Sequence, residues 1–261
     1  MSKPVRSSHQ LMELLINFIL RDIKIRYRGS LLGLFWVVFY PLSMTLIAAY
    51  VLSVIIKLNT EGVPYYLFAM IGIISWNFFT QSVQAGTRSL TLNRELVANS
   101  NFPKILLVIS ANVAKSVDLC INLIIFFVVL IVINNVPVNI FSILIFLILI
   151  FFQIILQIAI SLITSGLNVY FRDIQNGIDI ILQVLFYLTP VIYPVSLVPN
   201  KIKTLLFFNP LSLLIELYRK ILFGQAFSFQ EILFVVLISS IMLIISLIFF
   251  QKTESGFADV I

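Results

Sequence analysis

Long apolar runs separated by short polar segments dominate the pattern of this chain. A helix needs about 20 apolar residues to cross the hydrocarbon core of a bilayer. Six runs approach or exceed that length, and they are Leu31–Ile56, Tyr65–Ala85, Ile105–Ile133, Ile140–Gly166, Ile178–Pro194 and Phe229–Phe250. Because backbone polar groups find no partner in lipid, these runs are expected to be helices. The pattern therefore predicts an all-α integral membrane protein with six transmembrane helices.

The composition agrees with this class. Hydrophobic residues make up 61% of the 261 residues and charged residues 11%, whereas soluble domains carry about 25% charged residues. We expect residues 1–261 to form one transmembrane domain whose first run stays as an anchor, since it is too long for a signal peptide. Cys120, the single cysteine, lies inside an apolar run and is predicted to be a small buried hydrophobe.

The distribution of Lys and Arg predicts the orientation, because these residues gather in cytoplasmic loops. One side of the six-helix scheme carries Lys3, Arg6, Arg21, Lys24, Arg26, Arg28, Arg88, Arg94, Lys104, Arg172 and Lys252. The other side carries Lys57 and, in the segment 195–228, Lys201, Lys203, Arg219 and Lys220. We therefore predict a plasma-membrane protein with both termini in the cytoplasm. The positive charge of the segment 195–228 is the exception.

The segment 9–30 before the first run has helical periodicity. Its apolar residues Leu11, Leu14, Leu15, Phe18 and Ile25 recur at close to helical spacing, and charged residues occupy the other faces. This predicts an amphipathic helix on the cytoplasmic surface, with its basic face toward anionic lipid or a partner.

The segment 195–228 contains two apolar pieces that are too short to span a membrane. They are Thr204–Phe208 and Leu211–Leu217, separated by Asn209 and Pro210. We predict two short helices that lie at the outer face or dip into it. They either rest on lipid headgroups or line an exit, and the pattern leaves both readings open.

Polar residues recur at helical spacing inside several runs. The stripes are Tyr66, Asn77, Gln81 and Gln84; Gln153, Gln157, Ser161, Thr164 and Asn168; and Asp179, Gln183 and Tyr187. For any one stripe, hydrogen bonds between helices are the favoured interpretation. Several stripes together favour a polar path somewhere in the protein.

Aromatic residues accompany these stripes, among them Trp36, Tyr40, Trp76 and Tyr187. Trp and Tyr are common at membrane interfaces. A sharper hypothesis is a sugar path, because aromatic rings stack on sugar C–H faces and amides bond sugar hydroxyls.

Several kinds of active site are not indicated. There is no P-loop motif, and His9 is the only histidine. Asp118 lies three residues after Lys115 and can pair with it. We therefore expect no enzyme activity, no catalytic or metal site and no cofactor on this chain, and a partner that supplies energy.

Five segments stand in a fixed order along the chain. They are RDIKIRYRGSLLGLFWVVFYPL (21–42), ANSNFPK (98–104), LNVYFRDI (167–174), LFYLTPVIYPVSLVP (185–199) and FFNPLSLLIELYRKILF (207–223). Together they resemble the permease subunits of polysaccharide-exporting ABC transporters, the Wzm-like and TagG-like proteins. The resemblance covers nearly the whole chain.

The resemblance implies a homodimer that docks two ATPase subunits, which bind ATP and Mg²⁺. It implies entry of a lipid-linked polysaccharide at the helix 9–30, a coupling loop at 88–104 and an exit gate at 195–228. The residues that it assigns are as follows: entry, Arg21, Lys24, Arg26, Tyr27 and Arg28; coupling, Arg94, Glu95 and Asn99; gate, Tyr193, Asn209 and Pro210. With the polar stripes, it places Trp36, Tyr40, Trp76, Asn77, Gln81, Gln183 and Tyr187 along the channel.

Three functions stay open. The first is export of a lipid-linked O-antigen, capsule or teichoic acid chain. The second is a permease of the same architecture with a lipid or drug as cargo. The third is an intramembrane glycolipid transferase, for which paired acidic residues are expected and only the solitary Asp173 and Asp179 are present.

Overall fold

The computed structural model describes residues 8–27, 33–58, 60, 62–99, 102–199, 201, 203, 206 and 208–260, without the side chains of 258 and 259. Every regular element in these residues is a helix. In chain order they are α1 (Ser8–Tyr27), α2 (Gly33–Ala48), the π-helix η1 (Ala49–Ile55), α3 (Tyr65–Leu92), α4 (Arg94–Asn99), α5 (Ile105–Ala114), α6 (Ser116–Val128), the π-helix η2 (Val129–Ile133), α7 (Ile140–Tyr170), α8 (Ile174–Leu188), the 3-10 helix η3 (Val195–Leu197), α10 (Pro210–Leu222), α11 (Phe229–Glu254) and α12 (Phe257–Val260). The all-α prediction is confirmed for this part of the chain.

Five helical segments in the described residues are long and apolar enough to cross a membrane. They are Gly33–Ile55, Tyr65–Leu92, Ile105–Ile133, Ile140–Tyr170 and Phe229–Glu254. The fifth predicted run, Ile178–Pro194, is different. Its helix α8 begins earlier, at Ile174, and ends at Leu188 before Pro190, because proline cannot continue a helix. Its 15 residues reach only about 22 Å, so the count of six spans stays a prediction.

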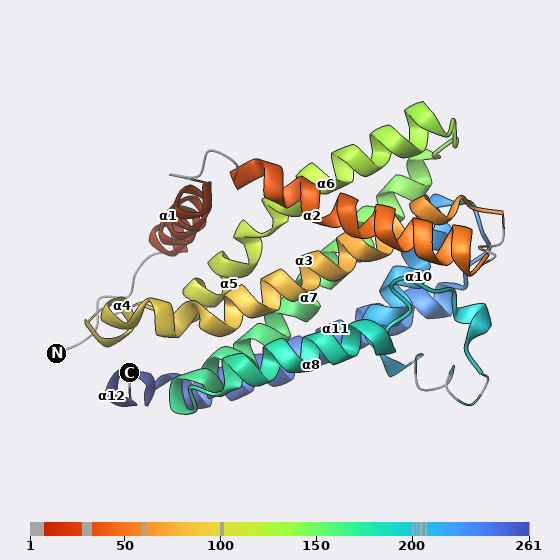
Figure 1. Ribbon diagram of the computed structural model, residues 1–261. Coiled ribbons are helices and arrows are strands. Elements are labelled where there is room, and N and C mark those ends of the chain that lie inside the picture. Colours follow the sequence, from red (N-terminus) through yellow and green to blue (C-terminus); the bar gives the residue numbers. More distant parts are fainter. Residues whose placement is uncertain are drawn as a thin grey trace.

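The helices run lengthwise past one another in alternating directions (Figure 1). α3 lies at the centre and packs against α2, α5, α6, α7, α8 and α10, while α11 packs along α7. Helices α1, α4 and α12 lie at one end of the bundle, on the left in Figure 1. The connection from η1 to α3, the connection from η2 to α7 and helix α10 lie at the other end. We call these the α4 end and the α10 end.

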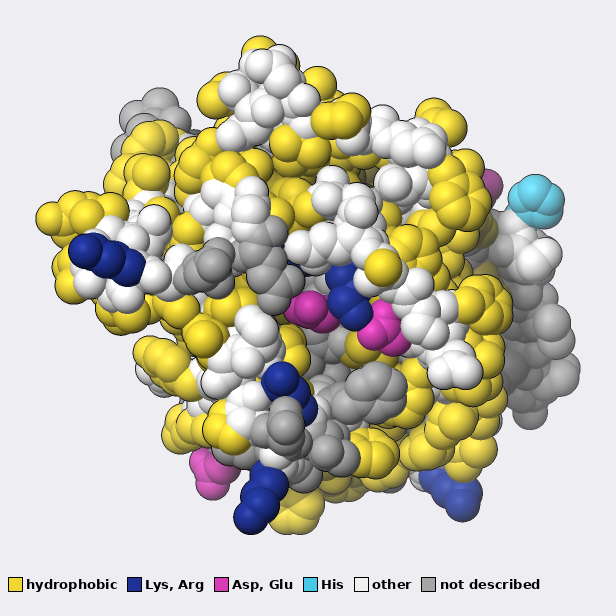
Figure 2. Space-filling model, turned by 90° about the vertical axis from the view of Figure 1, so that its right-hand side faces the viewer, with side chains coloured by type: hydrophobic (Ala, Val, Ile, Leu, Met, Phe, Trp, Pro, Cys, Tyr) yellow, Lys and Arg dark blue, Asp and Glu magenta, His cyan; other side chains and the backbone are white. Residues whose placement is uncertain are grey.

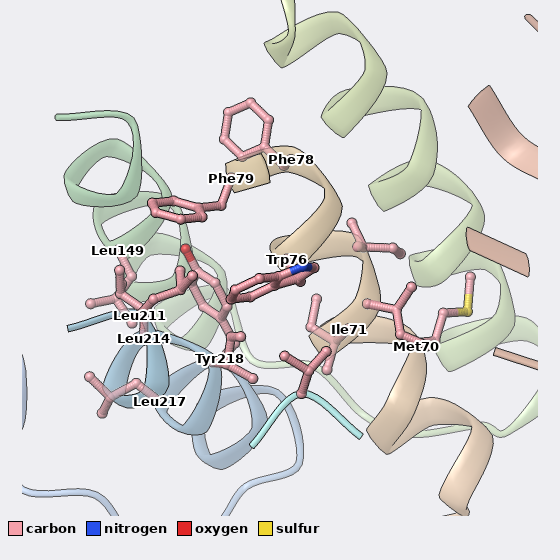
Figure 3. Close-up of a cluster of buried hydrophobic side chains, with 14 of the residues drawn as sticks. Met70, Ile71, Trp76, Phe78, Phe79, Leu149, Leu211, Leu214, Leu217 and Tyr218 are labelled. Atoms are coloured by element: carbon pink, nitrogen blue, oxygen red, sulfur yellow. The ribbon is translucent and has the colours of Figure 1, made fainter. Parts of the chain in front are cut away.

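The main apolar core surrounds α3 where α7 and α10 meet it. Figure 3 shows Trp76 and Phe79 of α3 facing Leu149 of α7 and Leu214 and Tyr218 of α10. The Tyr218 ring lies 4.9 Å from that of Phe146, centroid to centroid. α10 is therefore built into the bundle and is not a surface helix.

Polar residues of α7 face α3 along a parallel seam. Gln153 accepts hydrogen bonds from Ser75 (3.2 Å) and from the hydroxyl of Tyr218 (2.7 Å), and Thr164 bonds Thr87 at 2.7 Å. Further along, Asn168 donates to the carbonyl oxygen of Thr87. For Gln153, Thr164 and Asn168 the interpretation as hydrogen bonds between helices is confirmed, each bond contributing about 0.6 kcal/mol on average. Gln157 of the same stripe is buried, and both of its side-chain polar atoms lack a hydrogen-bond partner among the described residues.

Glycine allows the same seam to close. A Cβ atom on Gly86 would lie 2.4 Å from Oγ of Ser161 and 2.6 Å from Nδ2 of Asn112. Only a residue without a side chain fits this crossing of α3, α5 and α7.

The prediction that Cys120 is buried is wrong, since its side chain is exposed. The buried residues of α6 are Asp118, Leu119, Asn122 and Phe126, which form one helical stripe. Cys120 lies off that stripe on the outer surface of the helix.

Candidate functional site

α1 is fastened to the bundle by a polar cluster around Asp118. The Nη2 atom of Arg26 lies 2.6 Å from Oδ2 of Asp118 and donates to the side-chain oxygen of Gln81 at 3.0 Å. The hydroxyl of Tyr27 also donates to Asp118. The expected pair of Asp118 with Lys115 is replaced by the pair with Arg26, because the end of α1 brings a second cation to this carboxylate. The cluster joins α1, α3 and α6.

Tyr27 keeps its proton in this cluster. Burial of its ring, and then the hydrogen bond to Asp118, raise the pKa of Tyr27 to about 12. The phenol is therefore a hydrogen-bond donor at every physiological pH.

A cavity of about 20 Å³ lies beside the cluster. Its polar lining is Asn77, Gln81, Lys115, Asp118 and Asn122. This volume holds about one water molecule. Nδ2 of Asn77 is buried near it without a hydrogen-bond partner among the described residues. The structure thus brings Asn77 and Gln81 together beside Arg26, in a space far smaller than a sugar ring.

The other predicted channel residues lie in two places. Trp36 and Tyr40 are exposed on α2. The rings of Phe35 and Phe39 stack on each other there, and both meet the Trp36 ring edge to face. On α8, Gln183 and Tyr187 are exposed as well.

Trp76 lies inside the single chain. It packs against Phe186 of α8 with ring centroids 5.7 Å apart, and 5% of its surface is exposed. It therefore does not share a surface with the four exposed residues of α2 and α8.

The sequence suggested that Arg219 adds to the positive charge of the surface at the α10 end. The structure buries this residue instead. The residue is 2% exposed, and its guanidinium donates to the carbonyl oxygens of Phe68 (3.2 Å), Pro190 (2.7 Å) and Val191 (2.5 Å). It also lies 3.5 Å from the centre of the Phe68 ring. Burial lowers the pKa of Arg219 to about 10, so it stays charged at neutral pH. We call these contacts the Arg219 clamp.

A sequence signal for the clamp existed. Arg219 follows Leu211 by eight residues and Ile215 by four, and both are buried. Arg219 therefore lies on the apolar face of α10, and a charged residue on such a face indicates a structural or functional partner.

The predicted gate residues fasten the turn 189–194 and the start of α10. The Asn209 side chain accepts from the backbone N–H groups of Leu211 and Ser212 and donates to the Thr189 hydroxyl at 3.0 Å. Pro210 is the first residue of α10, a position that suits proline. The hydroxyl of Tyr193 donates to the carbonyl oxygen of Tyr187 at 3.0 Å. The predicted short helix at Thr204–Phe208 falls largely outside the described residues.

Lys220 is paired with Glu231 at 2.7 Å, which ties α10 to α11. Seen from the α10 end, charged side chains of both signs gather near the centre and apolar side chains surround them (Figure 2). Of the four cations predicted for the segment 195–228, Arg219 is therefore buried and Lys220 is paired, whereas Lys201 is exposed and Lys203 is half-buried.

At the α4 end, the predicted coupling residues Arg94, Glu95 and Asn99 are exposed. Val97 is the buried residue of α4. The preceding span is longer than predicted, so that Arg88 lies within α3, where it pairs with Asp179 of α8. Sequence reasoning missed this pair because it assigned Arg88 to a loop.

The basic residues of α1 have unequal surroundings. Lys24 is exposed. Arg21 pairs with its neighbour Asp22 at 2.8 Å and lies over the Phe18 ring. Arg28 lies outside the described residues. No group of three His, Cys, Asp or Glu side chains that could hold a metal occurs in the described part of the chain.

Comparison with known proteins gives a consistent match. The family model described as ABC-2 type transporter matches residues 13–223. The O-antigen export system permease protein RfbA of Myxococcus xanthus is 26% identical over 262 residues, which cover 99% of each chain. The protein of the same name from Klebsiella pneumoniae is 25% identical over 251 residues, 96% of each chain. The polysialic acid transport protein KpsM of Escherichia coli is 21% identical over 201 residues, 77% of this chain and 78% of its own.

Proposed function

This chain belongs to the ABC-2 type transporter family, and we propose that it is the membrane-spanning subunit of an ATP-driven exporter of a lipid-linked polysaccharide. The observation that carries the proposal is the likeness to O-antigen export permeases over nearly the full length of both chains. The names of these relatives, O-antigen export and polysialic acid transport, favour a glycan over a drug as the cargo.

We place the α4 end in the cytoplasm. Its described cations are Arg21, Lys24, Arg26, Arg88, Arg94, Lys104, Arg172 and Lys252, whereas the α10 end has Lys57, Lys201, Lys203 and the paired Lys220. An excess of Lys and Arg favours the cytoplasmic side. The Arg219 clamp strengthens the proposal, because it removes one cation from the α10 surface.

α4 is the proposed contact for the ATPase. Its residues Arg94, Glu95 and Asn99 are exposed at that end, so all three are free to form charged or polar contacts across an interface. Two ATPase subunits, with ATP and Mg²⁺, would dock on the two copies of a homodimer.

The glycan path would lie between the two copies. Within one chain the cavity beside Asn77 and Gln81 is about 20 Å³. The exposed aromatic residues of α2 and α8, by contrast, are free to face a partner or a sugar. Trp36, Tyr40 and Tyr187 are therefore the ring-stacking residues that we propose for the path.

The lipid diphosphate would first meet α1. Lys24 is the exposed cation there, and Arg21 and Arg26 are already paired with carboxylates of this chain. Arg side chains suit phosphate groups, so the substrate would compete with Asp22 and Asp118 for them.

The proposal is tested by co-purification with the ATPase encoded beside this chain. ATP hydrolysis is measured in lipid nanodiscs with and without the permease, and with a polyprenyl-diphosphate oligosaccharide as probe. We expect a stable complex whose hydrolysis depends on the permease and rises with the probe. A chain that binds no ATPase and modifies the glycolipid by itself would support the transferase instead.

A pair of charge reversals locates the contact. Arg94→Glu on α4 should weaken the complex with the ATPase. Lys201→Glu, an exposed cation toward the α10 end, is the matched control and should leave it intact. Equal affinity of both variants for the ATPase would contradict the assignment of α4.

A further inference from the structure

α4 is a short helix that depends on its surroundings. Its six residues follow α3 after Asn93, and Val97 is the side chain that it buries. Isolated helices of this length are not stable in water. Its position is therefore set by the residues that pack around Val97.

Those residues form one apolar cluster, which we call the end cluster. Its buried members are Phe18, Leu90, Val97, Phe102, Leu106, Leu107, Val108, Leu162, Val169, Phe250 and Phe257. They come from α1, α3, α4, α5, α7, α11 and α12 and from the segment after α4. α4 thus shares a packed core with the last long helix, which is distant in sequence.

Phe257 of α12 is the fully buried contribution from beyond α11. Its ring lies 5.4 Å from that of Phe250 and 6.0 Å from that of Tyr170, centroid to centroid, and α12 contacts α4. Gly166 makes room for this packing, since a Cβ atom there would lie 3.2 Å from the Phe249 ring and 3.6 Å from the Phe257 ring.

A hydrogen bond forms a second link to the same region. The carboxylate of Glu254, the last residue of α11, accepts from the backbone N–H of Lys104 at 2.7 Å. Lys104 lies just before α5, in the connection that follows α4. The end of α11 therefore holds α4 through Phe257 and holds its outgoing connection through Glu254.

The opposite end of α11 touches α10. There a capping box of Ser228 and Glu231 begins the helix, and Glu231 pairs with Lys220 of α10 at 2.7 Å. The 26 residues of α11 span about 39 Å. One helix thus connects the end cluster with α10.

We propose that Phe257 and Glu254 are positioning residues that couple α4 to α11, so that a displacement of α4 reaches α10 along that helix. The proposal rests on the proposed function, in which the ATPase moves α4. Packed protein interiors have low compressibility and transmit strain. A fully packed end cluster therefore transmits a displacement of α4 to α11, whereas side chains that relax into a cavity would take up part of that displacement.

The test uses the full chain with its ATPase in proteoliposomes. The probe is a fluorescent polyprenyl-diphosphate oligosaccharide, and the measured quantity is probe translocated per ATP hydrolysed. Phe257→Ala should lower this ratio about five-fold or more, the lower range of coupling between sites, while the ATPase stays bound and active. Val260→Ala, an exposed position on the same helix, should leave the ratio unchanged.

Glu254 offers a rescue experiment. Glu254→Ala should lower the ratio, because it removes the acceptor for the Lys104 N–H group. Glu254→Gln should keep the ratio near that of the wild type, since its amide oxygen accepts from the same group.

The outcomes separate the two proposals. If Phe257→Ala translocates as much probe per ATP as the wild type, the coupling role is overturned. This holds even if the variant is less stable than the wild type. A wild-type chain that neither binds nor stimulates the ATPase overturns the proposed function itself. Uncoupled hydrolysis in Phe257→Ala, beside coupled hydrolysis in the wild type, supports both.

Discussion

α2 and α3 are both long enough, with η1 added to α2, to cross a membrane, but they lie in opposite surroundings. Of the most apolar 18-residue window, 78% is buried in α3 and 11% in α2 with η1. The buried helix holds Asn77, Gln81, Gln84 and Thr87, whereas α2 is almost wholly apolar with exposed aromatics. In a membrane the exterior is as apolar as the core, so polar contacts mark the helix that other helices surround.

The largest effect is expected at the Arg219 clamp, which fastens α10 to the turn at Pro190 and Val191 and to the start of α3. In Arg219→Met the carbonyl oxygens of Pro190 and Val191, which lie outside the helices, lose their donor, and each buried group without a partner costs about 1–3 kcal/mol. We expect little folded protein, measured as the monodisperse fraction and the unfolding temperature in detergent. Lys220→Met breaks a partly exposed pair worth about 1 kcal/mol or less and is the matched control. Equal yields of both variants would refute the clamp.

The next largest difference in stability is expected between alanine variants of the two tryptophans. Trp76→Ala should lower the free energy of unfolding by about 3–5 kcal/mol, because it opens a cavity beside Phe79 and Phe186. Trp36→Ala changes an exposed residue and should cost less than about 0.5 kcal/mol, yet it should reduce probe translocation. Unfolding of both variants in nanodiscs measures the first quantity. Similar losses of stability would contradict the contrast between the helices.

Glycine substitutions test how tightly α3 is packed. Gly86→Ala inserts a methyl group 2.4 Å from Oγ of Ser161, and overpacking of this kind costs about 1–3 kcal/mol. Gly177→Ala on α8 meets nothing within 4 Å and should be neutral or stabilising by up to about 1 kcal/mol. The unfolding temperatures of Gly86→Ala and Gly177→Ala, each compared with the wild type, test this difference. A stable Gly86→Ala protein would mean that α3 and α7 separate more easily than their contacts indicate.

The smallest effect is expected at the attachment of α2. Nδ2 of Asn122 donates to the carbonyl oxygen of Val37 at 3.2 Å, and such bonds between membrane helices contribute about 0.6 kcal/mol on average. Asn122→Leu should speed hydrogen exchange of α2 amides without a change in global unfolding. Unchanged exchange in α2, or faster exchange in α3, would show that the bond does not hold α2.

Hydropathy predicted the long helices well, because every segment that crosses a bilayer must be a helix of about 20 mostly apolar residues. The starts of the five long helices agree with the predicted runs to within two residues, whereas α3, α7 and α11 end four to seven residues beyond them. The predicted run Ile178–Pro194 extends past the end of α8 at Leu188, because hydropathy continues through Pro190 whereas the helix does not. An apolar run tolerates a turn when a buried arginine satisfies its carbonyl groups, and Arg219 comes from a distant part of the chain.

The candidate site was predicted less completely, since partners of polar groups depend on tertiary structure. Helical spacing paired Asp118 with Lys115, whereas the end of α1 supplies Arg26. The pair of Arg88 and Asp179 likewise joins residues 91 positions apart. In the sequence, the aromatic residues of α2 and Trp76 of α3 look alike, since all lie in apolar runs. Only the packing of the helices shows that the former are exposed and the latter is buried.

The exposed thiol of Cys120 has a consequence for symmetry. In a homodimer the single cysteine of one copy can bond only with its own counterpart. Identical residues meet across a two-fold interface only near its axis, and a disulfide requires Cα atoms within about 7 Å. If oxidation of the native protein in a membrane gives a cross-linked dimer, the two-fold axis lies beside α6.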